Sequence, residues 1–201
     1  MGGLQICFSG RLRIARSVPL SFGDDLKGDL YLPVKTEGRM PVVIWLHPYA
    51  YSTGYSRNAG PTIADLTQQG FAVFAFDQIG FGTRIHQAGR FYERYPKWSL
   101  LGKMVADTRA AVDALVALKE VDRSKLYLAG YSLGGKVALW TAALDTRVAG
   151  VIAASAATTL RTASRQRGSA PLLASSWIIA APRFLRRPEA EVPVDYTDYL
   201  R

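Results

Sequence analysis

The sequence contains a single cysteine, Cys7, and only two histidines, His47 and His86. One cysteine cannot form an internal disulfide, and these three residues do not suffice for a Cys/His zinc site. Disulfide-rich scaffolds and zinc fingers are therefore excluded. We expect neither a metal ion nor a cofactor.

Long apolar runs are also missing. Beside Arg11, Arg13 and Arg16 the apolar cluster 4–8 is too short for the core of a signal peptide. The uncharged stretch 168–182 is shorter than the roughly 20 residues that a membrane-spanning helix needs. We expect no integral membrane segment, and a cytoplasmic location if Met1 is the true start.

Acidic residues are scarce relative to basic ones, with 16 Asp and Glu against 25 Lys and Arg. The surplus is concentrated in residues 161–187, which hold six arginines and no acidic residue. A basic protein that binds a membrane surface or another anion is one hypothesis for this segment, although nothing beyond its charge favours it. We expect no nucleic-acid partner, and the sequence does not predict an oligomeric state.

The composition is that of a folded chain, because 49% of the 201 residues are hydrophobic. Several apolar runs are continuous rather than alternating, which is typical of strands covered on both faces in a parallel sheet. Predicted strands lie at 26–33, 41–46, 71–76, 125–129 and 148–156, and predicted helices at 61–69, 99–118 and 133–144. Strands that alternate with helices predict one α/β domain.

The helix predicted at 99–118 carries an apolar stripe that would pack on the sheet. Its polar face would carry Lys103, Asp107, Arg109 and Asp113. We therefore expect these four side chains at the surface.

The chemistry is expected at the segment Gly130-Tyr131-Ser132-Leu133-Gly134, which joins a predicted strand directly to a predicted helix. Such a turn strains the serine backbone, and it needs flanking glycines so that the strand and the helix can approach. Ser132 would project at the carboxyl edge of the sheet, where the helix N-terminus favours a developing negative charge. The alternative is a tight glycine turn with an inert serine.

A second donor for that charge should follow the strand 41–46. Pro48 has no N–H, so the donor would be the backbone of Tyr49. We expect His47 to hydrogen-bond the loop backbone rather than act as the catalytic base, and His86 to lie on the surface. Asp77 ends the strand 71–76 and is expected to brace the loop that follows.

These motifs, in this order, resemble the α/β-hydrolase superfamily, with similarity to its acetyl xylan esterase and dienelactone hydrolase-like branches. The resemblance covers residues 26–156. It implies an α/β-hydrolase fold, a mostly parallel sheet with helices on both faces, and a carboxylic ester hydrolase. It also implies that Ser132 is the nucleophile and that Tyr49 and Leu133 supply the oxyanion hole through their backbones.

The family places its acid and then its histidine after the nucleophile, but no histidine follows Ser132. We therefore interpret residues 1–201 as a single, partial α/β-hydrolase domain that lacks the last two strands, with 160–190 as a possible cap-like insertion. Asp195 and Asp198 are not expected to be the catalytic acid. We expect this chain to be inactive by itself and its strand at 148–156 to form an exposed apolar edge.

Tyr131 and Lys136 are the predicted substrate contacts. Glucuronoyl esterases resemble this stretch through Gly130, Ser132, Gly135 and Lys136, but their arginine after the serine is a leucine here, so a deacetylase or a general carboxylesterase fits better. Lys136 would otherwise be a solvated helix cation. The competing functional hypothesis is a non-catalytic α/β-hydrolase-like binding protein or an inactive fragment.

Overall fold

The computed structural model describes residues 16–33, 35–36 and 38–156 of the chain. In this part the strands are β1 (Arg16–Phe22), β2 (Leu26–Leu32), β3 (Met40–Leu46), β4 (Ala72–Phe76), β5 (Val121–Tyr131) and β6 (Gly150–Ala154). The helices are α1 (Ser56–Gln68), α2 (Phe91–Arg94), α3 (Leu100–Ala117) and α4 (Leu133–Leu144). Two 3-10 segments, η1 (Tyr51–Thr53) and η2 (Gly82–Ala88), lie in the loops after β3 and β4.

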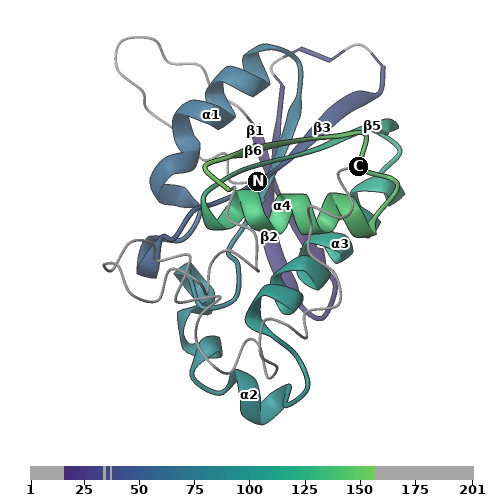
Figure 1. Ribbon diagram of the computed structural model, residues 1–201. Coiled ribbons are helices and arrows are strands. Elements are labelled where there is room, and N and C mark those ends of the chain that lie inside the picture. The colour runs from purple at the N-terminus through teal and green to yellow at the C-terminus, as the bar shows by residue number, and fades with distance from the viewer. Residues whose placement is uncertain (1–15, 34, 37, 157–201) are drawn as a thin grey trace.

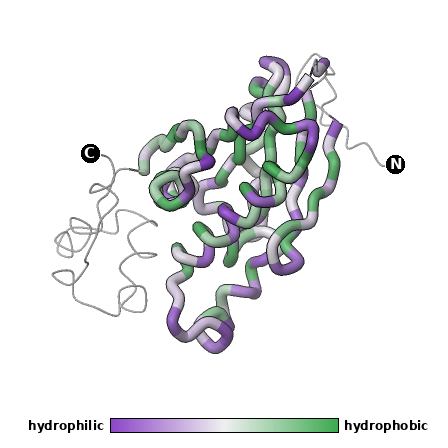
Figure 2. Tube along the Cα trace, turned by 90° about the vertical axis from the view of Figure 1, so that its right-hand side faces the viewer, coloured by the Kyte–Doolittle hydropathy of each residue, from purple (hydrophilic) through white to green (hydrophobic). Residues whose placement is uncertain are grey.

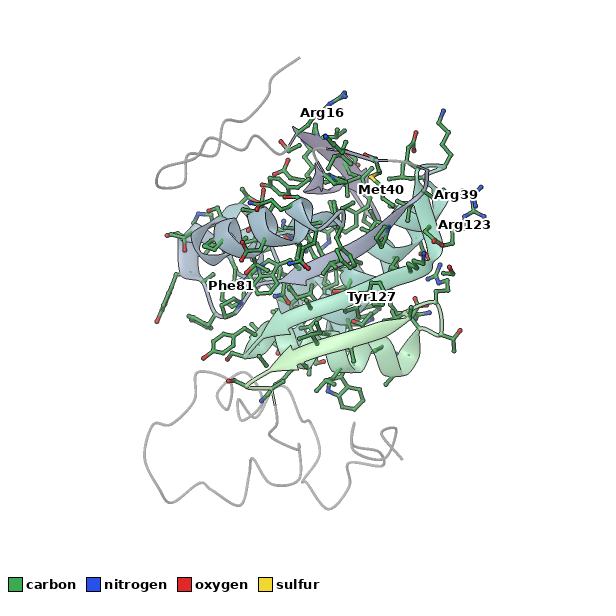
Figure 3. The ribbon with its side chains drawn as sticks, turned by 90° about the horizontal axis from the view of Figure 1, so that it is seen from above. Arg16, Arg39, Met40, Phe81, Arg123 and Tyr127 are labelled. Carbon is green, nitrogen blue, oxygen red and sulfur yellow. The ribbon has the colours of Figure 1, made fainter. Side chains whose placement is uncertain are left out.

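The six strands form one sheet in the order β1-β2-β4-β3-β5-β6. Strands β4, β3, β5 and β6 are parallel neighbours, whereas β2 runs antiparallel to both β1 and β4. The carboxyl ends of β3, β4, β5 and β6 therefore meet at one edge of the sheet. Figure 3 shows Phe81 at the end toward which the strand arrows point, with Arg39, Met40 and Arg123 at the other.

Helices cover both faces of the sheet, which explains why its central strands are apolar throughout (Figure 1). On β3 and β4, alternate side chains such as Ile44 and Phe74 join the core with α3 and α4. Their neighbours, including Val73 and Ala75, pack with Ala59 and Ile63 of α1. Figure 2 shows the hydrophobic positions gathered in the interior and hydrophilic ones predominating around α2, at the bottom of the view.

Most of the predicted elements are confirmed, with shifted ends. Helix α1 begins five residues before Pro61, which lies inside the helix. Strand β5 begins four residues before the predicted start at Lys125. Helix α3 agrees closely, because the Ser99 hydroxyl accepts the Gly102 N–H at 2.9 Å and caps its first turn.

The prediction for the polar face of α3 is wrong for two residues. Lys103 and Asp107 are buried, whereas Arg109 and Asp113 are exposed. The buried pair faces the segment between β4 and α3, which packs over this part of the helix. The helical period alone does not reveal such a second packing partner.

Strand β6 is at the edge of the sheet among the described residues, and Ile152 on it is 72% exposed. The possible cap-like insertion at 160–190, the basic segment 161–187 and both Asp195 and Asp198 lie outside the described residues. In the described part of the chain, no helix combines the length and apolarity that crossing a membrane requires.

Candidate active site

Ser132 stands between the last residue of β5 and the first residue of α4, in a strained backbone conformation. Its φ is 54° and its ψ is −112°. A non-glycine residue at positive φ costs of the order of 1–3 kcal/mol and persists only when its surroundings enforce it. The sharp strand-to-helix turn predicted from the sequence is therefore present.

The glycines around Ser132 are required by close backbone packing. A Cβ atom at Gly134 would lie 1.9 Å from the carbonyl oxygen of Leu46, and one at Gly130 would lie 2.3 Å from the carbonyl carbon of Gly134. A Cβ atom at Gly135 would lie 2.8 Å from the Cβ atom of Ala156. The turn therefore presses the start of α4 directly against the carboxyl end of β3.

Backbone hydrogen bonds hold Ser132 in place. Its N–H donates to the carbonyl of Ala154 at 2.8 Å, and its own carbonyl accepts the Lys136 N–H at 3.1 Å. The Leu133 N–H pairs with no acceptor among the described residues. It belongs to the first turn of α4, where N–H groups lack acceptors within the helix and the helix dipole favours negative charge.

The loop after β3 is fixed by a reciprocal pair of contacts between His47 and Gln78. The Gln78 N–H donates to His47 Nε2 at 3.0 Å, and the Gln78 side-chain amide donates to the His47 carbonyl at 2.9 Å. His47 Nε2 is thus an acceptor, so Nδ1 carries the proton and donates to the Pro48 carbonyl at 2.6 Å. Burial lowers the pKa of His47, which keeps the ring neutral at pH 7.

The expectation for His47 is confirmed, because both ring nitrogens are engaged with loop backbone. His86 is exposed within η2, also as expected. The role of Gln78 was not predicted, and the only signal in the sequence is its place directly after an apolar strand and Asp77.

Asp77 braces two loops, as expected. Its carboxylate accepts the Tyr55 N–H at 2.9 Å and, on the other oxygen, the N–H and hydroxyl of Thr83 at 2.8 and 2.9 Å. A Cβ atom at Gly54 or Gly82 would fall within 2.2 Å of a carboxylate oxygen of Asp77. These contacts join η1 and η2 at the carboxyl edge of the sheet.

Tyr49 lies in the loop between His47 and η1. Its ring meets Phe81 edge-on at 4.9 Å and Tyr51 at 4.6 Å between centroids. Burial raises the pKa of the Tyr49 phenol, with Tyr51 adding to the shift, so the ring is neutral at pH 7. Because Leu46 abuts Gly134, the loop that carries Tyr49 and the turn that carries Ser132 are neighbours.

A buried ion cluster that was not predicted anchors the segment after β4. Arg84 contacts one carboxylate oxygen of Asp107 at 2.9 Å, and Lys103 contacts the other at 2.5 Å. Arg84 also donates to the Asp77 carbonyl at 3.1 Å. The sequence gives little sign of this cluster, because Arg84 lies 23 positions from Asp107 in a segment without regular periodicity.

Lys136 is buried, so the alternative of a solvated helix cation is wrong. Only 4% of the residue is exposed, and its ammonium nitrogen has no hydrogen-bond partner among the described residues. Burial lowers the pKa of this amine to about 8. The glycine-rich first turn places α4 close to the sheet, and Lys136 lies on its inward side.

Tyr131 is 49% exposed and lines a cavity of about 400 Å³ beside the turn. The other lining residues are mostly apolar: Trp45, Pro48, Thr62, Ala129, Gly130, Ile152 and Ala154. Ser132, Leu133, Tyr131 and the loop of Tyr49 are thus brought to one edge, while Lys136 lies beneath it. Within the described residues, no group of three or more His, Cys, Asp or Glu side chains could hold a metal ion.

Known structures share this fold. A glucuronoyl esterase from Teredinibacter turnerae T7901 matches with a TM-score of 0.62 and 16% identity, covering 100% of this chain and 57% of that one. The acetyl xylan esterase from Paenibacillus sp. R4 matches with a TM-score of 0.58 and 21% identity, covering 90% of this chain and 59% of that one. These likenesses show the α/β-hydrolase fold.

A sequence relative is the Bacillus subtilis (strain 168) protein named "Putative hydrolase YtaP", which is 34% identical over 131 residues. The match covers 58% of this chain and 43% of the relative, so the chain spans less than half of that relative's length. A second match, to the α/β-hydrolase family described as serine aminopeptidase, S33, spans residues 41–194. The chain belongs to this family.

Proposed function

We propose that this sequence is the nucleophile-bearing part of a serine ester hydrolase that cleaves acetyl or other carbohydrate esters through an acyl-enzyme at Ser132. The observation that carries the proposal is the backbone of Ser132, held at φ 54° between glycines that admit no side chain. An inert turn has no need of a strained serine at the edge of the sheet. The fold and the family support the assignment.

The proposed reaction begins with attack of the Ser132 oxygen on the ester carbonyl carbon. A base takes the hydroxyl proton, and the backbone N–H groups of Leu133 and Tyr49 bind the oxygen that becomes negative. The tetrahedral intermediate collapses, and the alcohol leaves with a proton. Water then hydrolyses the acyl-enzyme by the same steps, which releases the acid and restores Ser132.

The general base in this proposal is neither of the two histidines in the sequence. His47 has both ring nitrogens engaged with the loop, and His86 is exposed within η2. A histidine encoded elsewhere in the full reading frame would supply the base. We therefore expect the 201-residue chain alone to hydrolyse esters at no measurable rate.

Tyr131 and Lys136 are the proposed substrate contacts. Tyr131 offers an exposed ring beside the apolar cavity next to Ser132. Lys136 lies one helical turn after Ser132, and its buried ammonium has no hydrogen-bond partner among the described residues. An oxygen atom of the substrate could accept a hydrogen bond from it. No cofactor is needed for this chemistry.

Kinetics of the protein from the full reading frame test the proposal. With short-chain p-nitrophenyl esters, Ser132→Ala should reduce kcat/KM at least about a thousandfold, as loss of a triad member does. Ser124→Ala is the matched control, because Ser124 is an exposed serine on the same strand that bonds Asp122. Hydrolysis near the wild-type rate in Ser132→Ala would reject Ser132 as the nucleophile.

A further inference from the structure

The loop after β3 carries an aromatic residue in a conformation that tyrosine rarely adopts. Tyr51 has a φ of 46°, and the residue is 62% exposed. This region of φ favours glycine or asparagine, and a bulky residue there is strained. Burial of the ring in the core does not account for a tyrosine at this position.

The loop around Tyr51 is held on both sides and cannot relax the strain. Thr53 donates to the carbonyl of Ala50 through its N–H at 3.1 Å and through its hydroxyl at 2.5 Å. Two residues further on, the Tyr55 N–H is fixed on Asp77 at 2.9 Å. The backbone therefore presents the Tyr51 ring outward from a rigid support.

The Tyr51 ring is the outermost of a continuous series of rings. It meets Tyr49 at 4.6 Å, Tyr49 meets Phe81 at 4.9 Å, and Phe81 meets the buried His47 at 5.4 Å, all edge-on. The series starts beneath the loop that carries the proposed oxyanion donor and ends in solvent. Figure 3 places Phe81 at the carboxyl end of the strands, the end that also holds Ser132.

We propose that Tyr51 determines specificity by packing its exposed ring against a six-membered ring of the ester substrate. Aromatic side chains gain contact from the flat apolar face of a sugar or an aryl ring, and much less from a flexible linear chain. The position of the ester at Ser132 rests on the proposed function. The substrate class is thus an ester of a ring-containing alcohol, such as a sugar or a phenol, with the ring next to the bond that is cleaved.

The test measures binding to the Ser132→Ala protein of the full reading frame, so that no turnover is required. The ligands are methyl tri-O-acetylxylopyranoside, phenyl acetate and triacetin, an acyclic triacetate that matches the sugar ester in acetyl groups. Adding Tyr51→Asn removes the ring and supplies a residue that tolerates positive φ. We expect the Kd for a ring-bearing ester to rise about three- to tenfold and the Kd for triacetin to stay unchanged. Tyr51→Phe should retain the affinity.

If Tyr51→Asn raises the Kd for the sugar ester alone, the result supports a carbohydrate ester as the substrate. If it raises the Kd for phenyl acetate alone, the result supports an aryl ester. Tyr51→Asn should leave the melting temperature within about 2 °C or raise it, because it relieves strain. Asp25→Asn is the matched control, because Asp25 also has a positive φ (57°), in the turn between β1 and β2. It should not change the ratio of the Kd for the ring-bearing esters to the Kd for triacetin.

The proposal is overturned if the ring-bearing esters do not bind, or if Tyr51→Asn weakens the binding of ring-bearing esters and of triacetin equally. A loss of stability with an unchanged affinity ratio would also overturn it and would make Tyr51 a structural residue. Failure of the proposed function has a separate signature, which is undiminished ester hydrolysis in Ser132→Ala.

Discussion

Ser132 depends on its glycine neighbours more than on any side-chain contact. The Leu46 carbonyl occupies the space that a side chain at Gly134 would fill. This contact joins the strained residue to the loop that begins at His47, so the proposed nucleophile and the proposed oxyanion donors are positioned by the same backbone packing. Changing one glycine should therefore disturb both.

We expect Gly134→Ala to lower the free energy of unfolding by about 3 kcal/mol or more, because its Cβ would lie 1.9 Å from backbone that cannot move aside. Urea unfolding monitored by circular dichroism measures the change. Gly89→Ala is the control, since its Cβ would meet its nearest neighbour at an ordinary 3.7 Å. Equal stability of the two variants would show that the close approach is not enforced.

Burial of Lys136 should make the stability of the fold depend on pH. Its pKa is about 8 in the folded chain against an ordinary 10.5, so between these values the unfolded chain binds more protons and stability rises with pH. Below about pH 8 the full cost of the buried charge is present. Lys136→Met should raise the melting temperature by about 2–4 °C at pH 7 and flatten the rise in stability between these pH values.

Thermal unfolding from pH 6 to 10.5 in about half-unit steps, compared with Lys125→Met at an exposed position, checks this linkage. A lower melting temperature of Lys136→Met at pH 7 would mean that the ammonium finds a stabilising partner.

For single residues, the sequence predicts the local backbone geometry well, but it predicts poorly which charged side chains are buried. The segment 130–134 is enough to predict the strained conformation of Ser132. The position of His47 at the end of a strand is enough to predict that its ring bonds the loop backbone. Lys136 looks like an ordinary helix lysine because its burial depends on how closely α4 approaches the sheet. That approach is set by contacts of Gly134 and Gly135 with distant residues.

The strands and helices differ in how well the sequence predicts them. Strands β3 and β4 are continuous apolar runs because both of their faces are covered, and this pattern predicts them directly. Strand β1 was not predicted, since it contains Pro19, is largely exposed and owes its conformation to antiparallel pairing with β2. Segments η1 and η2 have no periodicity and are fixed by polar contacts instead.

The strongest of those contacts is at Asp107, which binds Arg84 and Lys103 together. Asp107→Asn would leave two buried cations without a counter-charge and should cost about 3–5 kcal/mol. Lys103→Met, which leaves Arg84 paired with Asp107, should cost less than about 1.5 kcal/mol. Urea unfolding at pH 7 compares the two, and a similar loss in both would contradict the role of Asp107 as the shared partner.

At the scale of the whole described structure, helices cover the central strands of the sheet, whereas β6 pairs on one side only, with β5. Ile152 is 72% exposed on this edge strand, and Tyr131 beside it is 49% exposed. Unpaired edge strands with apolar side chains favour association between chains. The class of fold and the alternation of strands and helices were predictable from the sequence, because both follow from apolar patterning along the chain.

We expect the 201-residue chain to self-associate through β6, and Ile152→Lys to weaken that association at least about tenfold, since a buried isoleucine contributes about 1.5–3 kcal/mol. Sedimentation velocity over a range of concentrations measures it. Leu144→Lys, at an exposed leucine of α4, should have little effect. A wild-type chain that remains monomeric at all concentrations would contradict the prediction.

The central claim is that Ser132 is the nucleophile, and covalent labelling tests it most directly. The protein from the full reading frame is treated with a fluorophosphonate, which reacts with activated serines, and the digested peptides are analysed by mass spectrometry. We expect one adduct, on the peptide that contains Ser132, and none in Ser132→Ala. An adduct on a different serine, in a protein that hydrolyses esters, would contradict the account.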